Sequence, residues 1–73
     1  MFKQMKKAIH AAELKRQKVA MFHYQVLKNA KELEQVNPIE FCKEMGMSKT
    51  YSTEFRKMIS LARVVEEQGT KLV

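Results

Sequence analysis

The chain has 73 residues, of which 45% are apolar and 30% are charged, and its formal net charge is +6. This length and composition predict one small folded domain, with residues 1–36 and 37–73 as its two parts, and exclude a disordered chain. No uncharged apolar run approaches the ~20 residues of a membrane span, and no apolar stretch of a signal peptide follows the basic start, so we expect a cytoplasmic protein.

The positive charge is unevenly distributed along the chain. Residues 1–31 hold eight basic side chains and one acidic one, whereas residues 32–48 hold four acidic side chains and one basic one. Residues 49–57 are basic again, with three cations and one acid. A surplus of positive charge indicates what kind of molecule a protein binds rather than how it folds. We therefore expect a polyanion to contact the first and third of these segments and not the middle.

Residues 2–35 are expected to form one long helix or two stacked helices, with the polar stretch 13–18 as the site of any break. Apolar positions recur alternately every three and four residues, which places them on one narrow stripe. This apolar seam consists of Phe2, Met5, Ile9, Ala12, Arg16, Val19, His23, Val26, Ala30 and Leu33, with Arg16 and His23 as polar interruptions. A second set at Ala20, Tyr24, Leu27 and Lys31 widens the stripe, which predicts that this half faces a core as well as a partner.

The apolar seam indicates a homodimer. At 1.5 Å per residue it would be about 45 Å long, which the remaining short helices could not cover. A second copy would cover it, and the pair would present two copies of the last helix to two half-sites. The residues expected at the dimer interface are Phe2, Met5, Ile9, Ala12 and Val19.

Two further helices are predicted after residue 36. Asn37 is a good N-cap, Pro38 suits the first helical position, and Glu40 stands where a capping-box acid lies, so a short helix should begin here and stop at Gly46. After Met47, Ser48 is a second N-cap. The helix from there should end near Gln68, and it should bury the following side chains: Tyr51, Phe55, Met58, Ala62 and Val65.

The segment Pro38–Met58 resembles the helix-turn-helix of small bacterial and phage transcription regulators. It has a small residue, Cys42, at the helix crossing, and then Gly46 for the turn, Met47 to fill the core and Ser48 as the cap. Phe55 stands where that family keeps an apolar anchor. Ser52 departs from the pattern, which has Val or Ile there, and Tyr51 is expected to fill the space. The resemblance implies an all-α fold with a longer helix, about residues 49–67, in the major groove of DNA.

The outward face of that helix supplies the candidate contacts to double-stranded DNA. They are Lys49, Thr50, Ser52, Thr53, Arg56 and Lys57, of which Arg56 can donate to guanine and Lys57 to phosphate. Further phosphate contacts could come from the basic residues near the N-terminus: Lys3, Lys6, Lys7, Lys15, Arg16 and Lys18. Alternatively, both faces are simply solvated, and the first helix could also lie on a membrane surface.

Little in the sequence indicates an enzyme. His10, His23 and Cys42 lack the spacing of metal ligands, Asp is absent, and there is no glycine-rich phosphate loop. We expect no catalytic residue, cofactor, metal or small-molecule ligand. The expected function is sequence-specific regulation of transcription. The alternative is a helical interaction module that binds or inhibits an acidic partner protein through its first helix, and RNA binding is a lesser option because Tyr51 and Phe55 should be buried.

Overall fold

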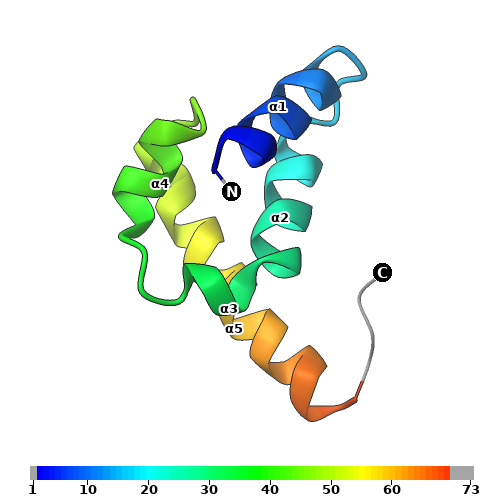
Figure 1. Ribbon diagram of the computed structural model, residues 1–73, viewed down its shortest axis with the longest axis vertical. Helices are drawn as coiled ribbons and strands as arrows, with labels where there is room; N and C mark the ends of the chain where they lie inside the picture. Colours follow the sequence, from blue (N-terminus) through cyan, green and yellow to red (C-terminus); the bar gives the residue numbers. More distant parts are fainter. Residues whose placement is uncertain (1, 70–73) are drawn as a thin grey trace.

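The computed structural model describes residues 2–69, and all the regular structure in that range is helical (Figure 1). The elements are α1 (Phe2–Glu13), α2 (Lys18–Lys28), α3 (Ala30–Leu33), α4 (Pro38–Glu44), a 3₁₀ turn η1 (Lys49–Tyr51) and α5 (Ser52–Glu67). The prediction of an all-α fold is therefore confirmed. None of the helices in this range is both long enough and apolar enough to span a bilayer.

The chain reverses direction between α1 and α2, within the polar stretch where a break was expected. The Gln17 amide donates to the carbonyl of Ala12 over 2.9 Å and the Arg16 amide donates to that of Glu13 over 3.0 Å. Arg16 adopts the left-handed conformation, with φ of 57°, that this helix ending requires. Arg16 is thus an exposed turn residue rather than a member of a continuous seam, and α1 folds back onto α2.

This reversal changes which face of the second half is buried. In α2 the core residues are Phe22 and Val26, whereas Val19 is exposed and His23 is only half-buried. The single stripe predicted across residues 2–33 is therefore wrong at Arg16, Val19 and His23, where the turn resets the helical phase, whereas its members Val26, Ala30 and Leu33 are buried as predicted. The second apolar set does not widen the buried stripe, since Ala20, Tyr24 and Lys31 are exposed. This half of the segment nevertheless faces the core as expected, through Phe22 and Val26.

Of the five residues predicted at the dimer interface, all but the exposed Val19 are packed within the single chain. Met5, Ile9 and Ala12 are buried within a single chain, and the ring of Phe2 lies 5.4 Å from that of Phe41 on α4. These side chains bury their apolar surface internally, so in this fold they do not form a surface for a second subunit. The length argument failed because it assumed that the first helix stays extended.

The helix-turn-helix segment follows its predicted boundaries closely. The Asn37 side chain accepts from the amides of Ile39 and Glu40, over 2.9 and 3.1 Å, and so caps α4. At the other end Gly46 has φ of 72°, and the Met47 amide donates to the carbonyl of Cys42 over 2.8 Å. After α5, Gly69 is again left-handed, with φ of 71°, as its predicted role of helix stop requires.

A cluster of aromatic rings joins the two parts of the chain into one core. Phe41 lies at its centre, with ring centroids 5.9 Å from Phe22 of α2 and 5.0 Å from Phe55 of α5. Tyr51 packs on Phe22 at 5.9 Å, which is the filling role expected of it. Helix α2 thus covers the back of the α4–α5 pair and holds the outward face of α5 in a fixed orientation.

Candidate nucleic-acid interface

The turn between α4 and η1 is built as a helix-turn-helix requires. Cys42 is fully buried in the core, where a larger side chain would force the helices apart, and burial raises the pKa of its thiol. Met47 is also buried and anchors the turn to the core. The Ser48 hydroxyl accepts from the Thr50 amide over 3.4 Å and caps the next element. That element begins with the 3₁₀ turn η1 before continuing as α5.

Burial defines the outward face of η1 and α5. Phe55 and Ile59 are buried, and Met58, Ala62 and Tyr51 are half-buried beside them. The opposite face is exposed and consists of polar and basic side chains: Lys49, Thr50, Thr53, Arg56, Lys57, Ser60 and Arg63. Ser52 was also predicted to contact DNA, but it is half-buried because it lies next to the core side of the helix.

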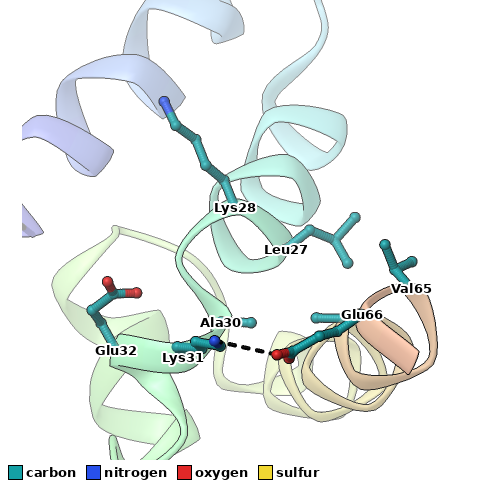
Figure 2. A pocket seen from close by; sticks show the side chains of 8 residues that line it. Leu27, Lys28, Ala30, Lys31, Glu32, Val65 and Glu66 are labelled. Carbon is teal, nitrogen blue, oxygen red and sulfur yellow. Dashed lines mark ion pairs between the residues drawn. The ribbon is translucent and has the colours of Figure 1, made fainter. Parts of the chain in front are cut away.

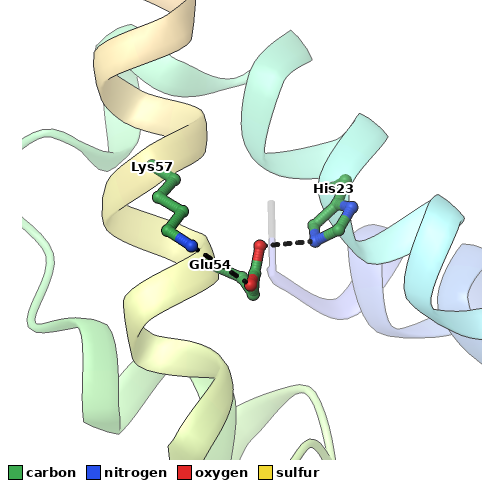
Figure 3. Close-up of polar contacts among 3 residues, drawn as sticks. All are labelled: His23, Glu54 and Lys57. Atoms are coloured by element: carbon green, nitrogen blue, oxygen red, sulfur yellow. Dashed lines mark ion pairs between the residues drawn. The ribbon is translucent and has the colours of Figure 1, made fainter.

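The cations on this outward face differ in how far they are neutralised. Lys57 Nζ lies 3.8 Å from a Glu54 carboxylate oxygen (Figure 3), and Arg63 Nε lies 3.6 Å from Glu34 Oε1. Within residues 2–69, Lys49 and Arg56 take part in no ion pair. These two exposed cations therefore carry the least compensated positive charge on the face. Sequence alone did not reveal this difference.

Glu54 also connects α5 to the helix behind it. His23 Nε2 on α2 lies 3.4 Å from Glu54 Oε2, as Figure 3 shows. The nitrogen itself is buried and makes no hydrogen bond in the described part of the chain, so this contact is electrostatic and needs a protonated imidazole. In the sequence, His23 stood out only as a polar interruption of the apolar seam. The partner on α5 could not be found without knowing how α2 packs.

The basic residues near the N-terminus fall into two groups. Lys3, Lys6, Lys7 and His10 are all exposed, and their spacing of three and four places them on one face of α1. His10 lies at the turn, with Nε2 3.6 Å from the point where a Cβ on Gly46 would stand. The His10 end of this face therefore adjoins the Gly46 turn. The second group, Lys15, Arg16 and Lys18, lies at or beside the α1–α2 loop, the upper right of Figure 1.

Comparison with known proteins agrees with this geometry. Residues 1–68 match the family described as an HTH-like domain, which is nearly the whole chain. The chain belongs to the HTH-like domain family. Since the match includes α1, α2 and α3, the HTH-like domain here is the complete five-helix unit and not only the segment from Pro38 to Met58. No curated protein and no solved structure matches the chain.

Proposed function

We propose that the protein is a sequence-specific DNA-binding regulator of transcription that inserts η1 and the first half of α5 into the major groove. Membership of the HTH-like domain family supports DNA binding at the level of the family. The observation that carries the finer proposal is the outward face of this element, which is exposed and has two cations outside any ion pair in residues 2–69, Lys49 and Arg56.

Base contacts are assigned to the N-terminal part of the element. Recognition helices read base edges with their first turns. Arg56 has the fork geometry to donate two hydrogen bonds to a guanine, and Thr53 can contact bases in the same groove. The Thr50 hydroxyl already donates to Ser48 over 3.0 Å, so it is left as an acceptor. Half-buried Ser52 contributes less than its neighbours, and Lys57 is assigned to phosphate.

Phosphate contacts are assigned to α1. Lys3, Lys6 and Lys7 share the face that adjoins the Gly46 turn, so a duplex on η1 would have its backbone near these ammonium groups. Such contacts add affinity for every sequence alike. The loop group of Lys15, Arg16 and Lys18 is proposed as a more distant set of phosphate contacts. The acidic side chains of residues 32–48 are not expected to touch DNA.

Fluorescence anisotropy with duplexes chosen from a random pool tests the proposal. If about six phosphates are neutralised, affinity should fall on the order of a thousandfold between 50 and 200 mM salt. Arg56→Ala should reduce the preference for the selected duplex over a scrambled one, whereas Lys6→Ala should weaken binding to both equally. Salt-independent binding, or identical effects of the two substitutions, would contradict the proposal.

The alternative of a protein-interaction module that uses the first helix gains no support from the fold. The apolar face of the first helix already packs within the chain, because Met5, Ile9 and Ala12 are core residues. Only the basic face of α1 would remain for an acidic protein. Capture of such a protein from nuclease-treated lysate by the wild type, together with no binding to any duplex, would favour this alternative.

A further inference from the structure

A single carboxylate on α5 lies between two basic side chains from different helices. Glu54 Oε2 lies 3.4 Å from His23 Nε2 on α2, and its other oxygen, Oε1, lies 3.8 Å from Lys57 Nζ, three residues further along α5 (Figure 3). The side chains of His23 and Glu54 are 30% and 35% exposed, whereas that of Lys57 is 65% exposed. Lys57 can therefore leave this contact for a phosphate, while His23 and Glu54 are held together by the packing of α2 on α5.

Glu54 is the one acidic group that pairs with His23 in residues 2–69. The Nε2 nitrogen is buried and makes no hydrogen bond in this range, so a positive charge on the ring is compensated by Glu54. The titratable side chains of α1 are exposed and none of them pairs with His23: Lys3, Lys6, Lys7, His10 and Glu13. From η1, Tyr51 packs on the ring of Phe22, and Lys31 of α3 is engaged with Glu66.

The three side chains respond differently to pH. An imidazole ordinarily changes its charge between pH 5 and 8, whereas carboxylate and ammonium side chains ordinarily keep theirs. With a neutral His23, Lys57 is the cation that compensates Glu54. A proton on His23 places a second positive charge at the same carboxylate, in the less exposed position, and so weakens the attraction between Glu54 and Lys57.

We propose that protonation of His23 strengthens DNA binding, because Glu54 then pairs with the imidazole and Lys57 is released to a phosphate. This inference rests on the proposed function, in which Lys57 contacts the DNA backbone. The proton acts from the back of the helix that carries the outward face and touches no DNA itself. Affinity should therefore rise as the pH falls through the range in which imidazole becomes charged.

Another ion pair on α5 provides the matched control. Lys31 Nζ on α3 lies 3.2 Å from Glu66 Oε1, beside a groove of about 480 Å³ whose lining includes Leu27 and Val65 (Figure 2). This pair joins an ammonium group to a carboxylate without an imidazole. Glu66→Gln thus removes a paired carboxylate from the same helix as Glu54→Gln does, but it leaves the contact with His23 in place.

Fluorescence anisotropy with a selected duplex at pH 5.5 and 7.5, at one low salt concentration, tests the effect on affinity. The chain has two histidines, and exposed His10 beside the Gly46 turn would titrate near the DNA, so every chain compared carries His10→Gln. This parent should bind about threefold more tightly at pH 5.5. Addition of Glu66→Gln should preserve that difference between the two pH values.

Two further substitutions should each remove most of the pH difference, but at opposite levels of affinity. His23→Gln should bind at both pH values as weakly as the parent does at pH 7.5, because Lys57 stays with Glu54. Glu54→Gln should bind at both as tightly as the parent does at pH 5.5, because Lys57 is always released. Circular dichroism checks that both variants fold. A parent without a pH difference, or an undiminished difference in either variant, would overturn the proposal.

Side-chain NMR of the free protein separates this mechanism from DNA binding itself. Between pH 7.5 and 5.5 the shift of the Glu54 carboxyl carbon should follow the titration of the His23 ring, and that of Glu66 should change much less. A Glu54 shift that does not follow His23 would overturn the proposal even if DNA binding depended on pH. Failure of every duplex to bind would contradict the proposed function, and with it the effect on affinity, but it would leave this titration unchanged.

Discussion

The imidazole of His23 on α2 lies 3.4 Å from the carboxylate of Glu54 on α5, and the same carboxylate lies 3.8 Å from the ammonium of Lys57. Glu54 therefore acts in two directions. It ties the supporting helix to the helix whose outer face is proposed to contact DNA, and it partly neutralises one cation on that face. Its own side chain is 35% exposed, so the screening of these contacts by water is incomplete.

Replacing this carboxylate by an amide should strengthen DNA binding. Glu54→Gln removes one negative charge from α5 and releases Lys57, so affinity for any duplex should rise roughly two- to fivefold at low salt. Fluorescence anisotropy at several salt concentrations measures this, and the gain should shrink as salt increases. Glu67→Gln, an exposed change in the last turn of the same helix, is the control and should have a smaller effect. Unchanged or weaker binding by Glu54→Gln would contradict the assignment of Lys57 to phosphate.

The turn at Arg16 should accept glycine with a gain in stability. Arg16 has φ of 57°, a conformation that disfavours residues with a Cβ and suits glycine. Arg16→Gly should therefore raise the free energy of unfolding by about 0.5–1 kcal/mol. Arg16→Ala removes the same charge but keeps the Cβ, so it should bring no such gain. Chemical denaturation of both variants provides the comparison, and equal stabilities would show that the backbone here is not strained.

Gly46 should not tolerate a side chain. A Cβ would meet His10 Nε2 at 3.6 Å, which is ordinary contact, so the effect should come from the φ of 72°. Gly46→Ala should lower the free energy of unfolding by about 1–2 kcal/mol. Gly69 has nearly the same φ but lies after α5 with open space around it. Gly69→Ala should have a smaller effect because the last turn can fray, and thermal melts of the two variants would reveal the difference.

Burial of Cys42 should make stability depend on pH in the alkaline range. Burial raises the pKa of its thiol above the ordinary value of 9.0, so the unfolded chain loses this proton at a lower pH than the folded chain. The contribution of Cys42 is then fully present below about pH 9 and declines as the pH rises through the raised value. Cys42→Ala should lose this dependence. Denaturation at about pH 8 and 10 compares the two proteins, and parallel curves would contradict the burial of the thiol.

The sequence allowed accurate prediction wherever a local signal determines the backbone. Asn37, Gly46, Ser48 and Gly69 act through their own hydrogen bonds or φ angles, and each lies at the helix end expected of it. The apolar periodicity was correct for α1 and again for Val26, Ala30 and Leu33, and it was misleading only between them. In the sequence the spacing of three and four residues continues through Arg16. In the structure the chain reverses at Arg16, although no glycine marks a turn there.

Contacts between distant segments could not be predicted in the same way. The pairing of His23 with Glu54, the position of His10 at Gly46 and the groove lined by Leu27 and Val65 all depend on how α1 folds back and how α5 crosses α2. A list of exposed residues on one helix can be derived from periodicity. To know which cations of that helix are neutralised by another element, one must know how the helices pack.

Amide chemical shifts of the labelled protein during titration with a selected duplex test the central claim most directly. The outward face of η1 and α5 should respond first, so the largest shifts should be those of Lys49, Thr50, Thr53 and Arg56, with smaller ones at Lys3 and Lys7 on α1. Shifts confined to the α1–α2 loop or to the groove lined by Leu27 and Val65, with the amides of residues 49–56 unaffected, would contradict DNA recognition by this face.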